Sequence, residues 1–142
     1  MQGHPKVAIV GGGIGGMAAA NALLRRGLDV NVYEQAPKLG EVGAGVLITP
    51  NSVRLMQRMG MGAALDAVGA RIGEGSRYYR ADGTVVAPIL TTDSRGWNGM
   101  FGMHRADLLN VLASAFPDDR VHTAHRCVGF TQDETVGRLR FD

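Results

Sequence analysis

The chain has 142 residues, of which 45% are hydrophobic and 20% charged, with 21 glycines and a formal net charge of +2. This composition is typical of one globular domain or part of one, and it excludes a disordered or collagenous chain. Because 15 lysines and arginines nearly balance 13 aspartates and glutamates, charge gives little support to nucleic-acid binding.

The first uncharged segment, residues 7–24, has two interpretations. Lys6 precedes it and it contains Ala20-Asn21-Ala22, so a secretory signal is an alternative. Five glycines interrupt its apolar run, and each would weaken a signal helix by roughly 1 kcal/mol. A glycine-rich binding loop is therefore the better explanation. The single cysteine, Cys127, excludes an internal disulfide framework, and no Cys/His cluster has metal-ligand spacing. We expect no metal site and a cytoplasmic setting.

The N-terminal segments predict a nucleotide-binding unit. The apolar, β-branched run from Lys6 to Val10 stops at a glycine and predicts a strand buried on both faces of a parallel sheet, at its centre. A G-x-G-x-x-G pattern follows, then a helix to Arg26 that Gly27 caps. A second strand is predicted from Asp29 to Tyr33. Strand, glycine turn, helix, strand and a final acid together indicate dinucleotide binding.

Each position of this unit has an expected role. Gly11 permits the tight turn, Gly13 lets the backbone approach a pyrophosphate, and Gly16 lets the helix pack against the strand. Free N–H groups at the helix start hold phosphate charge. Glu34 accepts hydrogen bonds from ribose hydroxyls and repels a 2′-phosphate, which disfavours NADP. The unit alone does not separate FAD from NAD.

The next segments are a second glycine-rich stretch and a helix. Residues 40–45 read Gly-Glu-Val-Gly-Ala-Gly and precede the apolar run 46–48. They are either a flexible connection or backbone that approaches a long, flat cofactor. Thr49 as N-cap and Pro50 open a helix that Gly60 closes, and its apolar residues at helical spacing are expected in the core.

From Arg71 the pattern changes to strands. Runs at 76–80 and 84–89 flank Ala-Asp-Gly and predict a hairpin. Residues 90–100 form a polar loop around Trp97, which we interpret as an anchor under the loop rather than as a pocket wall.

A strand at 101–104 is then expected to lead into a helix from Arg105 or Ala106 to 116, followed by paired strands at 121–130 and 135–141. Arg105 is a cation at the positive end of that helix, so either a nearby anion such as a pyrophosphate offsets it or water solvates it. His125 could share a strand face with Cys127, but we interpret the cysteine as a buried structural thiol. The chain ends directly after a strand, which predicts an incomplete domain.

The order of these parts resembles the FAD-dependent aromatic-ring hydroxylases, the flavoprotein monooxygenases of the salicylate hydroxylase and 6-hydroxynicotinate 3-monooxygenase type. The glycine fingerprint is common to many flavoproteins, whereas Gly-Ala-Gly-Val with Pro-Asn and the later His-Arg are more specific. The segments that carry the resemblance are residues 7–16, 32–37, 39–46 with Pro50-Asn51, 58–61 and 104–109.

The resemblance implies a fold and a cofactor. It implies an α/β, Rossmann-like FAD-binding domain of three layers with a parallel central sheet, an added antiparallel segment and an incomplete C-terminus. The domain is divided into a βαβ unit with the following helix (1–70), a hairpin insertion on the substrate side (71–104), and a helix with a strand pair (105–142). The implied FAD contacts are Gly11, Gly13, Ile14, Gly15, Gly16, Glu34, Gln35, Val46, Leu47, Arg105 and Cys127. Among these, Glu34 and Gln35 hold the adenine end, and Arg105 assists the glycines at the diphosphate.

The resemblance also implies an activity. NAD(P)H reduces the flavin and O2 then supplies an oxygen atom to a small aromatic acid, such as a salicylate- or hydroxybenzoate-like compound, with no nucleic-acid or membrane partner. Leu47 stands where hydroxynicotinate-type relatives have a histidine, which disfavours a hydroxypyridine substrate. The family's later flavin motifs would lie beyond Asp142, so the catalytic residues are unassigned and this piece alone is expected to be inactive. The alternatives are an FAD-linked dehydrogenase, reductase or halogenase, or a non-catalytic nucleotide-binding fragment.

Overall fold

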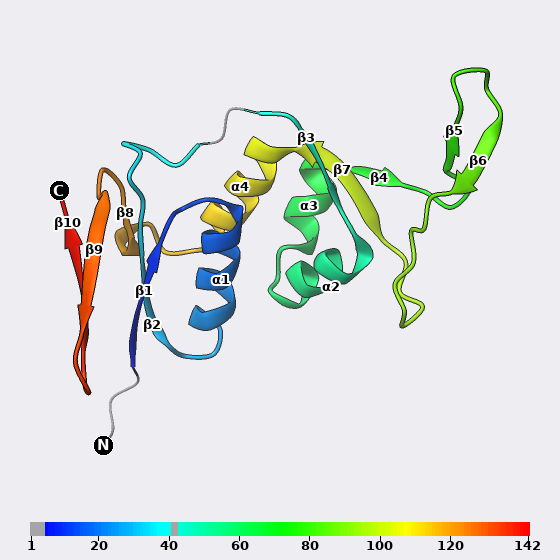
Figure 1. Ribbon diagram of the computed structural model, residues 1–142. Coiled ribbons are helices and arrows are strands. Elements are labelled where there is room, and N and C mark those ends of the chain that lie inside the picture. Colours follow the sequence, from blue (N-terminus) through cyan, green and yellow to red (C-terminus); the bar gives the residue numbers. More distant parts are fainter. Residues whose placement is uncertain (1–4, 41–42) are drawn as a thin grey trace. The chain divides into compact units, whose positions relative to one another are not determined.

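A computed structural model describes residues 5–40 and 43–142 (Figure 1). By their internal contacts the residues divide into two units, one of Met1–Val42 with Leu109–Asp142 and one of Gly43–Leu108. Glu41 and Val42, part of the second glycine-rich stretch, lie outside the described residues. None of the helices in the described ranges combines the length and the hydropathy needed to cross a membrane.

The first unit is built on a parallel sheet, as the fold-class prediction requires. Strands β1 (Lys6–Val10), β2 (Asp29–Tyr33) and β8 (Val121–His122) lie in the order β1-β2-β8 (Figure 1). Both pairings are parallel, and helix α1 (Ile14–Leu24) connects the first two strands. Val30 and Val32 are fully buried, because β-branched side chains on one face of β2 pack into the core.

The expected place of β1 was wrong. Strand β2, not β1, lies in the middle of the sheet, and alternate residues of β1 are exposed, with Val10 at 53%. β1 is an edge strand because, among the described residues, no strand pairs with its outer side. The exposed Lys6, Ala8 and Val10 share one face of β1, so its apolar run is partly covered on the other face only.

Helices α1 and α4 (Arg105–Ser114) are joined by a buried amide. The Asn21 Nδ2 group donates to the carbonyls of Met17 and Leu112, each at 2.8 Å. Helix α1 ends at Leu24, earlier than expected, and the chain reverses at Gly27, whose φ is +80°. Leu112 belongs to the last turn of α4, where carbonyls lack an intrahelical donor, so Asn21 satisfies one of them.

The other face of β2 carries polar and aromatic side chains. Asp29 pairs with Arg120 of the short 3₁₀ helix η1 (Asp118–Arg120) at 3.0 Å, and Asn31 contacts His122 at 2.9 Å. Tyr33 stacks on Phe141, with ring centroids 4.8 Å apart. This side of the parallel sheet is therefore held by ion-pair, hydrogen-bond and ring contacts instead of aliphatic packing.

The expected strand from 121 to 130 is two elements. Residues 121–122 are β8, and β9 (Cys127–Gln132) pairs antiparallel with β10 (Gly137–Phe141). Between them Ala124 has a φ of +55°, and its N–H donates to the Ala36 carbonyl at 2.9 Å. A left-handed residue interrupts strand geometry, so the chain leaves the parallel sheet and starts a separate hairpin.

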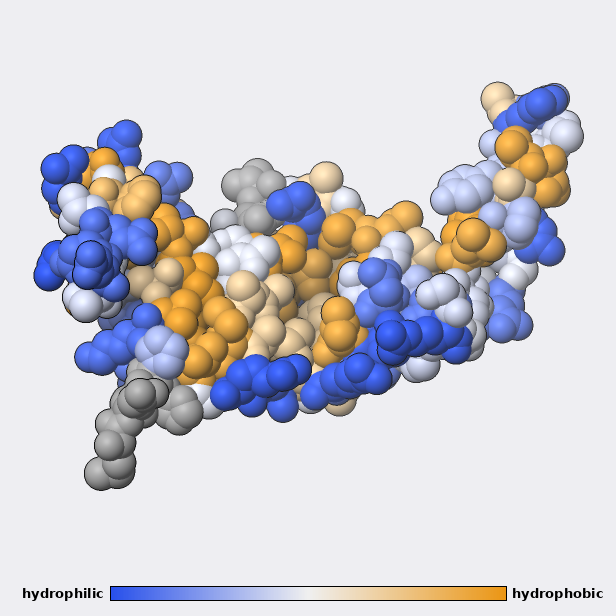
Figure 2. Space-filling view, turned by 60° about the horizontal axis from the view of Figure 1, so that its bottom comes forward, coloured by the Kyte–Doolittle hydropathy of each residue, from blue (hydrophilic) through white to orange (hydrophobic). Residues whose placement is uncertain are grey.

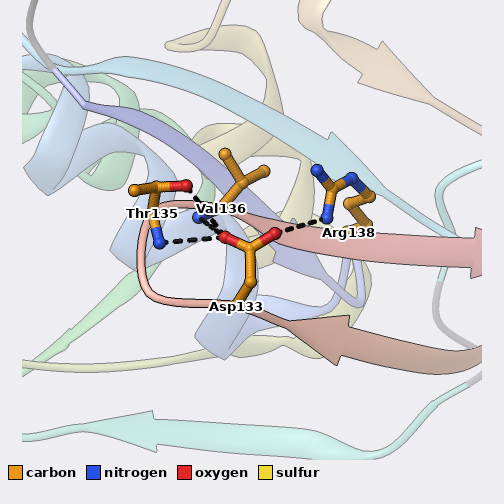
Figure 3. Close-up of polar contacts among 4 residues, drawn as sticks. All are labelled: Asp133, Thr135, Val136 and Arg138. Atoms are coloured by element: carbon orange, nitrogen blue, oxygen red, sulfur yellow. Dashed lines mark hydrogen bonds and ion pairs between the residues drawn. The ribbon is translucent and has the colours of Figure 1, made fainter.

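Asp133 closes the β9–β10 turn (Figure 3). Its Oδ1 accepts hydrogen bonds from the Thr135 N–H and hydroxyl and from the Val136 N–H, at 2.8–2.9 Å. Its Oδ2 lies 2.8 Å from Arg138. The Arg138 guanidinium first, and the Thr135 and Val136 donors next, hold the pKa of this carboxyl far below its usual range.

The second unit is an antiparallel sheet with two helices. Its strands are β3 (Gly45–Ile48), β7 (Met100–His104) and β4 (Ala70–Ile72), in the order β3-β7-β4. Helix α2 (Pro50–Arg58) begins at the expected proline, and the shorter α3 (Gly62–Val68) follows it. The core residues of this unit are Ile48, Val53, Met56, Met61, Leu65, Met100, Phe101, Met103 and Leu108.

The predicted hairpin is present as β5 (Arg77–Tyr79) and β6 (Val85–Pro88). Gly83 in its turn has a φ of +86°, as an Asp-Gly turn requires. Figure 2 shows apolar and polar residues interspersed on this hairpin, whose Tyr78, Tyr79, Val85 and Val86 are exposed. The hairpin therefore contributes little to the core.

The loop after β6 is tied to α2. Arg54 of α2 forms an ion pair with Asp93 at 3.2 Å, although the two atoms are not aligned for a hydrogen bond. Asp93 also accepts the N–H groups of Arg95 and Trp97, and the Trp97 N–H is the main cause of the lowered pKa of Asp93. Trp97 is half-buried with its ring against Gly99, in keeping with an anchor under the loop.

Candidate nucleotide-binding site

The glycine turn after β1 requires glycine at two positions, at one because of the backbone conformation and at the other because of the space. Gly11 has a φ of +104°, and its N–H donates to the Tyr33 carbonyl at 2.8 Å. A Cβ on Gly16 would lie 1.9 Å from the Gly11 carbonyl oxygen. The turn and the close approach of α1 to β1 therefore both depend on glycine.

The start of α1 presents unbonded N–H groups. Gly13 is the N-cap and provides no side chain, and the Met17 N–H is the one that reaches the Gly13 carbonyl, at 2.9 Å. The N–H groups of residues 14–16 precede it and have no intrahelical acceptor. Gly15 is exposed, and a Cβ there would meet nothing within 4 Å. Open space beside free N–H groups at the positive end of a helix favours an anion.

Glu34 follows β2 and points back to this turn. Its Oε2 accepts the Gly12 N–H at 2.6 Å, and its Oε1 accepts the Ala36 N–H at 2.8 Å. Each carboxylate oxygen has further lone pairs, so the group can still accept hydrogen bonds from a sugar hydroxyl. The two bonds fix the carboxylate before any ligand arrives.

Gly12 and Gly13 of the turn and Glu34 line part of a groove of about 220 Å³. It lies at the carboxyl ends of the parallel strands, where α/β sheets bind their ligands. Besides the carboxylate of Glu34, its lining has one cationic side chain, Lys38. The lining residues are Gly12, Gly13, Glu34, Ala36, Lys38, Leu39, Gly40 and Leu109.

Three sequence-predicted site residues lie in the second unit. Val46 and Leu47 belong to β3, and Leu47 is 55% exposed. The Arg105 N–H donates to the Ala44 carbonyl at 3.2 Å, and a Cβ on Gly43 would lie 3.6 Å from the Arg105 side chain. A Cβ at position 43 would therefore make an ordinary van der Waals contact with Arg105.

The remaining predicted positions lie in the first unit. Gln35 is exposed. Cys127 is half-buried, and its thiol donates to the Gly129 carbonyl at 3.5 Å, whereas the His125 Nδ1 contacts the Thr123 carbonyl at 2.7 Å. The two side chains thus have separate partners, which favours the structural interpretation of the thiol over a thiolate pair.

Sequence reasoning missed part of the groove. Leu39 lies against Gly12, since a Cβ there would be 2.5 Å from Leu39 Cδ2. No periodicity or motif indicates that contact. Lys38 could have been suspected because it follows the Pro37 turn close to Glu34 in sequence. The bond from Gly12 to Glu34 had a partial signal, because Gly12 is a further glycine between the two that the G-x-G pattern requires.

The parallel strands, glycine turn, free helix N-terminus and fixed acid define a dinucleotide-binding unit. A family model described as "FAD binding domain" matches residues 4–139. The chain belongs to this FAD-binding domain family.

Curated relatives are aromatic-ring oxygenases. The chain is 36% identical over 121 residues to 6-hydroxynicotinate 3-monooxygenase of Pseudomonas fluorescens, covering 83% of this chain and 31% of the relative. It is 37% identical over 134 residues to 3-hydroxybenzoate 6-hydroxylase of Polaromonas naphthalenivorans, covering 90% and 34%. The chain therefore spans about a third of the length of these relatives.

Solved structures agree with the fold. The 2,6-dihydroxypyridine-3-hydroxylase from Arthrobacter nicotinovorans superposes with a TM-score of 0.73 at 28% identity, covering 98% of this chain and 33% of that one. Klebsiella pneumoniae R204Q HpxO complexed with FAD gives 0.76 at 25% identity, covering 97% and 36%.

Proposed function

We propose that the chain binds FAD and forms the N-terminal part of a flavoprotein monooxygenase. That enzyme would use NAD(P)H and O2 to hydroxylate a small aromatic acid of the salicylate or hydroxybenzoate kind. The observation that carries the proposal is the fixed carboxylate of Glu34 in a groove lined by Gly12 and Gly13, directly before the free N–H groups at the start of α1. Family membership and the activities of the relatives support the assignment.

The donor set fits FAD. Three consecutive N–H groups suit a diphosphate, and the open space at Gly15 leaves room for it. Glu34 would accept hydrogen bonds from the adenosine ribose. A carboxylate at that position repels a 2′-phosphate, which favours FAD or NAD over NADP in this groove.

The other predicted residues extend the proposal. Arg105 would add positive charge at the diphosphate, and Val46 and Leu47 would contact the cofactor beside the Gly43 backbone. Gln35 and the backbone at Cys127 would contact the adenine side. When bound, FAD supplies the electron transfer and oxygen chemistry, while these residues hold and orient it.

Cofactor identification tests the proposal. The purified chain is expected to show a flavin absorption band, and mass spectrometry of the released nucleotide should identify FAD. Glu34→Arg should abolish the band, because a cation replaces the acceptor for ribose and for Gly12. Arg105→Ala should weaken FAD binding, while Arg26→Ala, which removes an exposed cation after α1, should not. Bound NAD without flavin would refute the assignment.

The proposed hydroxylation reaction is tested with the longer parent protein. With a panel of hydroxylated benzoates, we expect NAD(P)H oxidation, oxygen consumption and a hydroxylated product in equal amounts. NAD(P)H oxidation coupled to a reduced or halogenated product would indicate the reductase or halogenase alternative. FAD binding without NAD(P)H consumption under every substrate would indicate a non-catalytic binding module.

A further inference from the structure

Four aromatic rings lie close together at the end of β2, where Tyr33 precedes Glu34. Tyr33 stacks on His122 and on Phe141, with centroids 4.8 Å apart in both pairs. His125 lies 5.5 Å from Phe141, edge to face, and 5.9 Å from His122. We call Tyr33, His122, His125 and Phe141 the ring cluster. It joins residues from β2, β8 and β10 with the segment after β8.

Each imidazole of the ring cluster has one bonded nitrogen. The His122 Nε2 donates to the side-chain oxygen of Asn31 at 2.9 Å, and the His125 Nδ1 donates to the Thr123 carbonyl at 2.7 Å. Since both partners are acceptors, the bonded nitrogens carry the protons. The other nitrogen of each ring is the one that a proton would occupy on acidification.

Residues 122–125 form hydrogen bonds with both the N–H and the carbonyl of Glu34. The Glu34 N–H donates to the His122 carbonyl at 2.8 Å, and the His125 N–H donates to the Glu34 carbonyl at 2.9 Å. The Ala124 N–H adds a bond to the Ala36 carbonyl at 2.9 Å. A shift of residues 122–125 would therefore move the residue that faces the groove.

We propose that His122 and His125 are positioning residues for Glu34, and that their double protonation loosens its grip on the nucleotide. This inference rests on the proposed FAD function. Two imidazolium rings 5.9 Å apart repel each other. The groups that face them are Asn31 and Tyr33 of β2, Phe141 of β10 and the Thr123 carbonyl, and among the described residues no carboxylate contacts either ring.

The neighbouring charges do not relieve this repulsion. Asp29 on the same face of β2 is paired with Arg120 at 3.0 Å, and Asp142 after β10 is paired with Arg126 at 3.7 Å. Both of these carboxylates therefore already have cationic partners. Histidine changes charge between pH 5 and 8, whereas the diphosphate of FAD keeps its charge over that range, so the pH dependence would come from the protein.

The test measures the Kd for FAD of the 142-residue chain at pH 8 and pH 5.5. We expect binding to be roughly tenfold weaker at pH 5.5, from repulsion between two partly buried charges. The double variant His122→Phe/His125→Phe keeps four rings without the charges and should bind with a Kd that changes less than about twofold. His104→Gln, which removes an exposed histidine of β7 that is not part of the ring cluster, should retain the full pH dependence.

A second measurement needs no cofactor. Amide exchange of Glu34, corrected for its intrinsic pH dependence, should lose protection at pH 5.5 relative to Val32 in the wild-type chain. If FAD fails to bind at pH 8 while this loss is observed, the positioning inference stands and the proposed function fails. The inference is overturned if wild-type binding and Glu34 protection are the same at both pH values, or if the double variant keeps the acid weakening.

Discussion

Glu34→Gln is the most informative single substitution, because the two side chains have nearly the same shape. Both carboxylate oxygens of Glu34 accept backbone N–H groups, from Gly12 at 2.6 Å and from Ala36 at 2.8 Å. Glutamine offers one oxygen and one NH2 group. In either orientation of the amide, a donor would face a donor.

The expected cost follows from the lost acceptor. Leaving one partly buried N–H without a partner costs about 1–3 kcal/mol. For a chain of this size that corresponds to a melting temperature lowered by about 3–10 °C. Because the ribose acceptor is also altered, FAD affinity should fall together with stability.

The assay is thermal unfolding of the cofactor-free chain by circular dichroism, followed by calorimetric titration with FAD. Glu134→Gln is the matched control, since Glu134 is exposed and has no hydrogen bond or ion pair within the described residues. The reasoning is wrong if Glu34→Gln melts within about 1 °C of the wild type, a change well below the range expected from the lost hydrogen bond.

Four further substitutions test the glycine turn, the contact between α1 and α4, and the β9–β10 turn. Gly16→Ala should prevent normal folding or lower the free energy of unfolding by more than about 3 kcal/mol, because its Cβ would lie 1.9 Å from a carbonyl oxygen. Gly15→Ala has open space around the new Cβ, so in chemical denaturation it should be neutral or stabilising by up to about 1 kcal/mol. Asn21→Leu should cost about 1–3 kcal/mol by leaving a carbonyl of α4 without its donor at 2.8 Å. Asp133→Asn should remove a contribution to stability that is complete above the ordinary carboxyl pKa of 3.8 and disappears as the pH falls through the lowered pKa that Arg138 causes.

For each of these predictions, one outcome would contradict it. Equal stability of the two glycine variants would mean that α1 does not approach the turn as closely as the structure has it. A stabilising Asn21→Leu would show that the amide is not needed between the helices. For Asp133, the free energy of unfolding should be measured between pH 2 and 6, and the difference between variant and wild type should be largest near pH 6. A difference that is the same at every pH would show that this carboxyl does not contribute to the loss of stability in acid. Asp119→Asn, an exposed residue after α4, is the control.

The sequence alone determined the local chemistry of the nucleotide unit. Its glycine spacing, the strands on either side and the final acid are local signals, because each depends on backbone freedom or on residues a few positions apart. The hairpin around Gly83 and the start of α2 at Pro50 are local in the same sense, and both appear where the sequence indicated them.

Tertiary structure decided what depends on contacts between distant segments. Strand β1 has the apolar run of a central strand, yet its place in the sheet is set by which strands pair with it. The run from 121 to 130 divides because Ala124 bonds to Ala36, far away in sequence. The fixing of Glu34 by Gly12 and the ring cluster behind it also join residues that no periodicity relates. Such contacts depend on the path of the whole chain, so only the folded molecule defines them.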